Sequence, residues 1–500
     1  MTKIEEDMVR ERIVRRGIHM SKVIMVVFDG LQPSQVSEEL TPNIHGVASK
    51  GCFFEDHHCV FPSVTRANVA TLMTGTHPGV HGLLGNNFID VTYDPTRVIS
   101  ASNTEFDHMN KYDHEILNAK TMYQILQEFN MSYMAIGVGT TGNAYLHHVG
   151  GGDSDSNSGT IHPEFSNPSF LSEDILVKFG PWPEEEVPNN VRFSHAMDIF
   201  IEYILGEKNP EVALIWSSEP DKSQHAYGVG HHLSNSALEH ADKEFGRLLE
   251  KLGSNFMDSN TLMILSDHGY STIEEVIEVE KIMINAGFRI GSGKGELLLA
   301  LNGGSALISV GGSDVDTADR LVSWLMKQKW CGNILAGDRI GPIDGTIPLS
   351  KIGLGGPRSP DIVFSLNWNS RANQFKFQGR SASFAGAAGQ GTHGSISPHE
   401  MNNVLICDGP YFGKKRRILT PSGNIDVLPT ILDILGVESP HNINGRILKE
   451  AYKDTANELV FERNLLKSER TIEDNVFKQE IILSQLGGSI YIDEGSVLLE

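Results

Sequence analysis

Cysteine is scarce in this chain. The 500 residues include four cysteines, Cys52, Cys59, Cys331 and Cys407, and no two of them form a CxxC pair. We therefore expect four buried thiols in a reducing compartment rather than a disulfide framework. A bridge between Cys52 and Cys59 stays open, because it depends on local geometry that the sequence does not give.

The chain also lacks a long apolar run. Residues 1–22, MTKIEEDMVRERIVRRGIHMSK, contain no apolar core of a secretory signal, and no apolar stretch follows the Arg15-Arg16 pair. No segment approaches the roughly 18 apolar residues of a membrane-spanning helix. We expect a cytoplasmic protein that makes no use of a membrane.

Positive charge is in short supply. Lys and Arg total 41 against 63 Asp and Glu, a formal net charge of −22. Such a surface repels nucleic-acid backbones and anionic lipids, so we expect a small-molecule ligand and no nucleic-acid polymer. An anionic substrate would need local positive charge, which bound metal ions could supply.

What is present indicates an α/β fold. The composition is that of a globular protein, with 40% hydrophobic residues. Short apolar runs followed by polar residues or glycine predict buried parallel strands at residues 23–28, 133–138, 213–216, 262–265 and 404–406. Helical periodicity lies between them, at residues 119–130 and 235–252. This alternation predicts a mostly parallel central sheet covered by helices on both faces.

The remaining segments divide the chain. Residues 273–390 are rich in glycine and alternating stretches and contain one helical pattern at 317–327, so we expect a smaller inserted subdomain there. The core would then comprise residues 20–272 and 391–449. Residues 450–500 are charged, with a helical run near 456–468, and predict a C-terminal helical extension on the outside or in a homodimer contact.

Acidic and imidazole side chains follow three of the predicted strands. Asp29 comes directly after the first, Asp221 and His225 follow the third, and Asp267 and His268 follow the fourth. In open α/β sheets, ligands bind beyond the carboxyl ends of the strands. Carboxylates and neutral imidazoles are ligands for divalent cations. Each residue alone has a simpler interpretation, a helix cap for an aspartate or a hydrogen-bonded structural histidine. Their recurrence at one edge favours a metal site.

Thr65 stands at a predicted helix start. A threonine there is by default an N-cap, but helix N-termini also favour negative charge on an alkoxide or phosphoryl oxygen. Metal coordination would make its hydroxyl a nucleophile. Downstream, Asn86 lies in a glycine-rich loop and could donate to a substrate oxygen. We expect His77 and His81 in the same loop to be structural.

Taken together, these motifs resemble the alkaline phosphatase superfamily, and among its branches the type I phosphodiesterase/nucleotide pyrophosphatases and phosphonoacetate hydrolase. The resemblance spans residues 23–448, and its carriers in chain order are Phe28-Asp29-Gly30, Pro62-Ser63-Val64-Thr65, Thr74-Gly75, His81-Gly82, Gly85-Asn86, Asp221 with His225, Asp267-His268-Gly269, Gly391-Thr392-His393-Gly394, and residues 424–436.

The resemblance implies an alkaline-phosphatase-like three-layer sandwich with a smaller inserted cap. It implies two divalent metal ions. The mix of carboxylate and imidazole ligands suits zinc best, and manganese or iron are the alternatives. One ion would be held by Asp221, His225 and His393, and the other by Asp29, Asp267, His268 and the Thr65 oxygen. The role of His393 comes from the resemblance alone. Thr65 would form a phosphothreonine intermediate, and Asn86 and the Thr65 N–H would stabilise the phosphoryl oxygens.

The substrate class is the harder choice. Sulfatases need a Cys-x-Pro-x-Arg motif that is absent here, and cofactor-independent phosphoglycerate mutases use serine. Monoesterases and phosphonoacetate hydrolase place basic residues after the strand matching 133–138, whereas residues 137–144 contain no Lys or Arg. This favours a phosphodiesterase. Arg66, directly after Thr65, could supply the missing positive charge, but we expect it to be an exposed residue at the helix start. A phosphonoacetate hydrolase-like or phosphomonoesterase activity is the alternative, and a non-catalytic metal-binding relative is a third.

Overall fold

The computed structural model describes residues 21–152, 157–455 and 459–499. The predictions about a signal segment at the N-terminus therefore lie outside the described residues. Within them, none of the helices combines the length and hydrophobicity that crossing a membrane requires. The four cysteines are buried and unpaired, as expected.

The core is a nine-stranded, mostly parallel sheet in the order β21-β2-β20-β10-β1-β9-β6-β7-β8. Its strands are β1 (Val23–Phe28), β2 (Cys52–Phe54), β6 (Tyr133–Gly137), β7 (Gly159–His162), β8 (Phe165–Asn167), β9 (Val212–Ser217), β10 (Thr261–Leu265), β20 (Leu405–Asp408) and β21 (Arg416–Ile418). The central strands β10, β1, β9 and β6 run parallel, as predicted. The expectation that residues 404–406 form a parallel strand is wrong, because β20 runs antiparallel to both of its neighbours. A buried apolar run looks the same in either direction.

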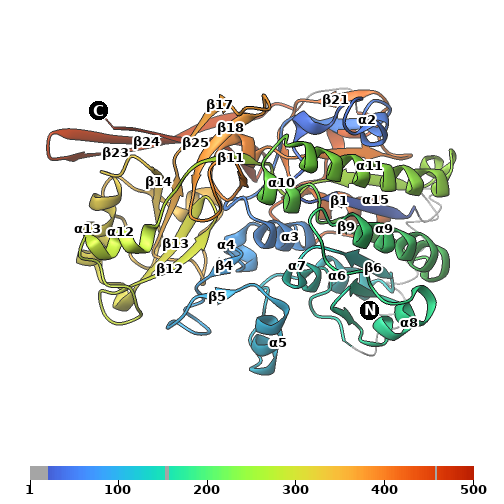
Figure 1. Ribbon diagram of the computed structural model, residues 1–500, viewed down its shortest axis with the longest axis horizontal. Coiled ribbons are helices and arrows are strands. Elements are labelled where there is room, and N and C mark those ends of the chain that lie inside the picture. The colour runs from blue at the N-terminus through green and yellow to red at the C-terminus, as the bar shows by residue number, and fades with distance from the viewer. Residues whose placement is uncertain (1–20, 153–156, 456–458, 500) are drawn as a thin grey trace.

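Alternation along the buried strands explains the three layers. In β1, Val23, Met25 and Val27 join one apolar cluster, while Ile24, Val26 and Phe28 join another on the opposite face. The first face is covered by α3 (Thr65–Thr74), α5 (Asn103–Lys111), α6 (Met122–Glu128) and α15 (Val427–Leu435). The second is covered by α2 (Pro42–Ala48), α8 (Phe170–Phe179), α9 (Asn190–Ile199), its continuation η2 (Phe200–Lys208) and α11 (His232–Leu252). The predicted α/β sandwich is thus confirmed (Figure 1).

Further sheets lie beside this core. A five-stranded sheet contains β12 (Leu297–Asn302), β13 (Ser305–Val310), β16 (Ile362–Leu366), β14 (Cys331–Ala336) and β15 (Ile347–Pro348), packed on α12 (Val279–Asn285) and α13 (Val315–Leu325). A four-stranded sheet contains β17 (Trp368–Ala372), β18 (Gln378–Ser383), β11 (Ser271–Val276) and β19 (Gly391–Thr392). Short elements complete the chain between these: β3 (His57–His58), β4 (Asn87–Phe88), β5 (Ile99–Ser100), β22 (Ser422–Gly423), α4 (Pro78–His81), α7 (Thr141–Leu146), α10 (Asp221–Tyr227) and α14 (Pro398–Met401).

The C-terminal segment is not helical, which corrects the prediction. Residues 462–499 form an antiparallel sheet of β23 (Glu462–Ile472), β24 (Asn475–Leu486) and β25 (Ser489–Leu499), and the hairpin of β23 and β24 projects at the left of Figure 1. In β24, Phe477, Gln479, Ile481 and Leu483 are buried, so every second side chain along this stretch faces the interior, as in a strand. The helical run predicted near residues 456–468 overlaps β23, whose side chains alternate between exposed and partly buried as in a strand. Residues 456–458 of the predicted helical run lie outside the described residues.

Candidate active site

The candidate ligands converge at one edge of the central sheet. Strand β1 lies between β9 and β10 and is parallel to both, so the carboxyl ends of the three strands meet. Asp29 follows β1, and Asp267 and His268 follow β10. Asp221 is the first residue of α10, and His225 lies one helical turn later on the same face. The structure thus brings together the five residues that the strand-end pattern singled out.

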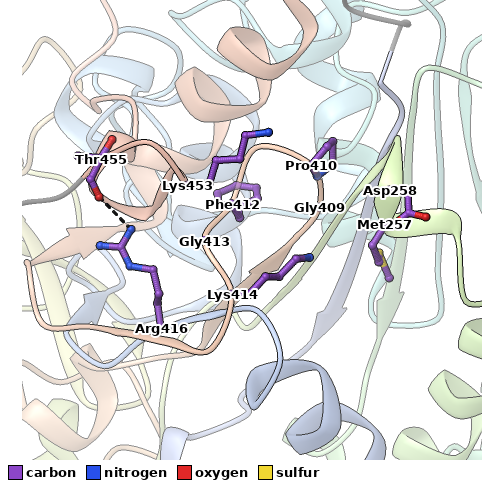
Figure 2. A pocket seen from close by; sticks show the side chains of 10 residues that line it. All are labelled: Met257, Asp258, Gly409, Pro410, Phe412, Gly413, Lys414, Arg416, Lys453 and Thr455. Carbon is purple, nitrogen blue, oxygen red and sulfur yellow. Dashed lines mark hydrogen bonds between the residues drawn. The ribbon is translucent and has the colours of Figure 1, made fainter.

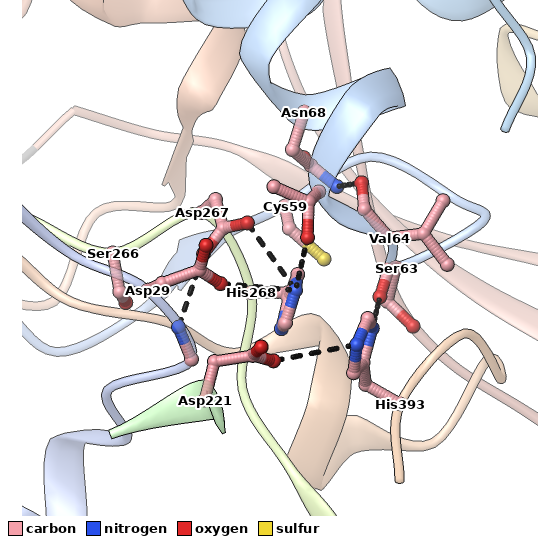
Figure 3. Close-up of polar contacts among 12 residues, drawn as sticks. Asp29, Cys59, Ser63, Val64, Asn68, Asp221, Ser266, Asp267, His268 and His393 are labelled. Carbon is pink, nitrogen blue, oxygen red and sulfur yellow. Dashed lines mark hydrogen bonds and ion pairs between the residues drawn. The ribbon is translucent and has the colours of Figure 1, made fainter. Parts of the chain in front are cut away.

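His393 arrives from a distant segment. It follows β19, which pairs with β11 just beyond the Asp267-His268 segment. Its Nε2 lies 3.1 Å from Nε2 of His225 and 3.5 Å from Oδ1 of Asp221. Asp221, His225 and His393 form one group whose donor atoms lie within 4.8 Å of one another. Figure 3 shows Asp221 pointing toward His393, with Asp29, Asp267 and His268 beside them.

Backbone carbonyls fix the tautomers of the three histidines. Nδ1 of His225 lies 3.1 Å from the Gly391 carbonyl, that of His268 lies 3.0 Å from the Gly269 carbonyl, and that of His393 lies 2.8 Å from the Ser63 carbonyl. A carbonyl only accepts, so each Nδ1 carries the hydrogen and each Nε2 presents a lone pair to the cluster. Carbonyl-oriented imidazoles of this kind are common at metal sites.

Two of the carboxylates, Asp29 and Asp267, each accept a hydrogen bond through one oxygen. Trp216 Nε1 donates to Oδ2 of Asp29 at 2.9 Å, and the Gly30 N–H donates to Oδ1 of Asp267 at 3.1 Å. The other oxygens, Asp29 Oδ1 and Asp267 Oδ2, are buried and accept no hydrogen bond from the described residues. They lie 3.8 and 3.2 Å from the unprotonated Nε2 of His268. Lone pairs that face one another in a buried site repel, and a bound cation would turn this repulsion into attraction.

The pKa shifts of the cluster residues are also those of a cation site. Burial raises the pKa of Asp29 well above its ordinary value, and the nearby charges of Asp267 and Asp221 raise it further. Burial likewise raises the pKa of Asp267. Burial lowers the pKa of His393 well below its ordinary value, helped by His268 and His225. Ionised carboxylates are therefore costly in this cluster without a compensating cation, and its oxygen and nitrogen donors suit zinc, manganese or iron.

The grouping differs in one respect from the two separate ligand sets expected above. The second group of donors within 4.8 Å of one another comprises Asp29, Asp221 and His268, so Asp221 belongs to both groups. Asp267 touches this group through its contact with His268.

Thr65 lies beside the cluster. It is the first residue of α3, and the N-cap is Val64, so the threonine side chain does not cap its helix. Its Oγ1 lies 3.4 Å from Nε2 of His268. The side chain is buried, at 5% exposure. The hydroxyl thus faces the candidate metal ligands at the amino end of a helix, where the N–H groups favour negative charge.

Asn86 and Arg66 flank Thr65. Asn86 Oδ1 accepts the Arg66 N–H at 3.0 Å, which leaves its Nδ2 donors without an acceptor in the described part of the chain. Arg66 is half-buried rather than exposed, which corrects the prediction, and its Nε is buried without a hydrogen-bond partner. Burial lowers the pKa of its guanidinium, while the three carboxylates of the cluster raise it. Its guanidinium therefore lies within electrostatic range of the three carboxylates of the cluster.

A cavity of about 660 Å³ lies elsewhere on the molecule (Figure 2). None of its lining residues belongs to the cluster around Thr65; they are Met257, Asp258, Gly409, Pro410, Phe412, Gly413, Lys414, Arg416, Lys453 and Thr455. Lys414 pairs with Asp408, and Arg416 donates to the carbonyls of Tyr452 and Thr455. Two of its three cations are thus already engaged within the protein.

The sequence that builds this site matches a known family. The model of the type I phosphodiesterase / nucleotide pyrophosphatase family matches residues 23–371, which include every candidate residue except His393. The chain belongs to this family. The type I phosphodiesterase branch of the alkaline phosphatase superfamily, expected from the motifs, is therefore confirmed.

Individual relatives of this phosphodiesterase family are distant. Ectonucleotide pyrophosphatase/phosphodiesterase family member 5 from Homo sapiens is 25% identical over 52% of this chain and 48% of its own length. Family member 3 from Bos taurus is 25% identical over 51% of this chain and 25% of its own length. The matched stretch thus spans at most about half of these curated relatives. The solved structure of murine family member 5, an inactive variant in complex with AMP, has the same fold, with a TM-score of 0.60 at 20% identity over 84% of this chain and 97% of that one.

Sequence reasoning missed several residues of the site. Trp216, at the end of β9, orients Asp29, and Ser63 orients His393. Tyr270 donates to Asp221 from the position after Gly269. An apolar strand residue, a serine before a helix and a tyrosine after a glycine carry no distinctive signal in one sequence. Only the position of Tyr270, directly after the Asp267-His268-Gly269 motif, could have drawn attention.

Proposed function

We propose that this chain is a metal-dependent phosphodiesterase that hydrolyses small phosphate diesters of the nucleotide type. The observation that carries the proposal is the Thr65 hydroxyl, 3.4 Å from the buried His268 in a cluster of three carboxylates and three imidazoles. Family membership supports the reaction class. The AMP bound to the structurally similar murine relative supports a nucleotide substrate.

The same residues suggest how the reaction would proceed. Divalent cations held by Asp29, Asp221, His225, Asp267, His268 and His393 would neutralise phosphoryl charge and lower the pKa of the Thr65 hydroxyl. Thr65 Oγ1 would attack phosphorus, forming a phosphothreonine as the bond to the leaving alcohol breaks. Water would then hydrolyse the phosphothreonine, releasing the monoester and restoring Thr65. The free Nδ2 of Asn86 and the Thr65 N–H would donate to the phosphoryl oxygens.

A second candidate function has one observation in its favour. The end of β6 and the start of α7 carry no Lys or Arg, which suits a diester with a single charge at phosphorus. Arg66, however, directs a buried, unpartnered Nε into the region beside Thr65. A guanidinium there could accept a second substrate charge, as a phosphomonoester or phosphonoacetate would bring. We place this activity second.

Purified protein tested on bis-p-nitrophenyl phosphate, p-nitrophenyl phosphate and phosphonoacetate, with elemental analysis, separates these functions. We expect two equivalents of a transition metal and the highest kcat/KM for the diester. Thr65→Ala should lose at least about 10³-fold in kcat, while Thr65→Ser should retain measurable turnover because it keeps a hydroxyl. Undiminished turnover by Thr65→Ala would remove the covalent mechanism. Metal binding without turnover of any of the three substrates would favour a non-catalytic relative.

A further inference from the structure

Tyr270 touches the carboxylate that belongs to both ligand groups. Its hydroxyl donates to Asp221 Oδ1 at 2.8 Å, and this is the oxygen that lies 3.5 Å from Nε2 of both His225 and His393. The side chain is fully buried.

The ring of Tyr270 lies among the three imidazoles. Its centroid is 5.3 Å from the rings of both His225 and His393 and 6.0 Å from the ring of His268. The backbone is built around it on two sides. A Cβ at Gly30 would lie 2.8 Å from the ring, and a Cβ at Gly391 would lie 2.6 Å from it. Glycine at both positions therefore makes room for this aromatic side chain.

We propose that Tyr270 is a positioning residue of the metal centre, which fixes the orientation of Asp221 toward His225 and His393. The proposal rests on the proposed function for the presence of metal ions. A hydroxyl that donates to an ionised carboxylate forms a strong, directional bond, and such partners of metal ligands set ligand geometry. Without this bond, Asp221 would rotate more freely at the start of α10, and its Oδ1 would no longer be held beside the Nε2 atoms of His225 and His393.

Tyr270→Phe tests the proposal because it keeps the ring that Gly30 and Gly391 accommodate and removes only the hydroxyl. The matched control is Tyr452→Phe, since the Tyr452 hydroxyl donates to Asp433 Oδ2 at the same 2.8 Å, from outside the cluster. Metal-free protein of each variant is titrated with zinc against a chromophoric chelator. We expect Tyr270→Phe to bind one zinc equivalent about 10–100-fold more weakly than wild type and to lower kcat on the diester more than it raises KM. Tyr452→Phe should match wild type in both measurements.

Wild-type zinc affinity at both equivalents in Tyr270→Phe would overturn the proposal, as would a wild-type chain that binds no zinc. An equal loss of zinc affinity in Tyr452→Phe would also overturn it, because the effect would then be one of general stability. The proposed function fails separately. If wild type binds two zinc equivalents but hydrolyses no diester, the function is wrong, while the zinc titration of Tyr270→Phe still decides the role of Tyr270.

Discussion

His225 and His393, separated by 168 residues in sequence, face each other with their Nε2 atoms 3.1 Å apart. Both Nδ1 atoms are bonded to carbonyls, so the two Nε2 lone pairs point toward one another. That contact is repulsive for two neutral imidazoles and becomes favourable when a cation lies between them and Asp221. The first prediction follows from this contact.

Metal removal should destabilise the fold. Because a cation binds the folded cluster and not the unfolded chain, stability rises by about 2.7 kcal/mol when the free ion is at 100 times its dissociation constant. We expect a strong chelator to lower the Tm in a thermal scan and added zinc to restore it. His225→Ala should show a smaller difference between the two conditions. An unchanged Tm after verified metal removal would contradict the cation site.

Asn86 should act on the chemical step. Asn86→Ala removes the amide donor, and we expect kcat on the diester to fall about 10²-fold with a smaller change in KM, as for an oxyanion donor. Asn86→Asp keeps an acceptor for the Arg66 N–H but replaces the donor by a negative charge, so it should be no more active than Asn86→Ala. Wild-type kcat in Asn86→Asp would assign the residue to helix capping alone.

Arg66 should discriminate between substrate charges. Arg66→Gln removes a guanidinium beside Thr65, and we expect kcat/KM for p-nitrophenyl phosphate to fall about 10-fold more than kcat/KM for bis-p-nitrophenyl phosphate. Steady-state kinetics on both substrates give the ratio. Arg247→Gln is the control, because Arg247 pairs with Asp198 and Glu244 on the surface of α9 and α11. Equal losses of kcat/KM for both substrates would exclude a role for Arg66 in binding the second negative charge of the monoester.

His81 should make stability depend on pH. Burial lowers the pKa of His81 to about 3, with smaller contributions from His77 and Arg358. The folded pKa lies below that of the unfolded chain, near 6.5, so the unfolded state binds more protons between these values. The contribution to stability is complete above pH ~6.5 and is lost as the pH falls toward 3, at about 1.4 kcal/mol per pH unit.

Urea unfolding at several pH values between about 4 and 7 measures this slope. We expect His81→Gln to show a shallower loss of stability on acidification than wild type, although it is less stable at pH ~7. It loses the contacts of the His81 ring with Thr71 and with the Leu83 N–H. A slope identical to that of wild type would show that His81 is protonated in the folded state.

Much of the core could be read from the sequence because its strands are buried on both faces. The run Val23–Phe28 was predicted with the bounds that the structure gives. Strand direction could not be read in the same way, and β20 was wrong for that reason. The C-terminal sheet was not predicted because many of its exposed residues are charged. The apolar residues on its other face are buried only by packing against the neighbouring sheet, which a sequence pattern does not show.

The sequence likewise predicted some residues of the candidate site and not others. Asp29, Asp221 and Asp267 could be found because strand ends meet at one edge, a rule that needs only the order of elements. His393 follows a two-residue strand in a glycine-rich loop, and no local pattern marks it. The direction of the Arg66 side chain depends on which face of α3 meets the cluster, so helix position alone gave the wrong exposure.

The bond between His393 Nδ1 and the Ser63 carbonyl joins residues 330 positions apart and ends two residues from Thr65. Closing so long a loop costs conformational entropy that only a nearly complete tertiary structure recovers. A nascent or partly folded chain would therefore hold Thr65 without the full set of candidate metal ligands beside it. Competence for catalysis would then arise late in folding, together with the last long-range contacts rather than with the central sheet.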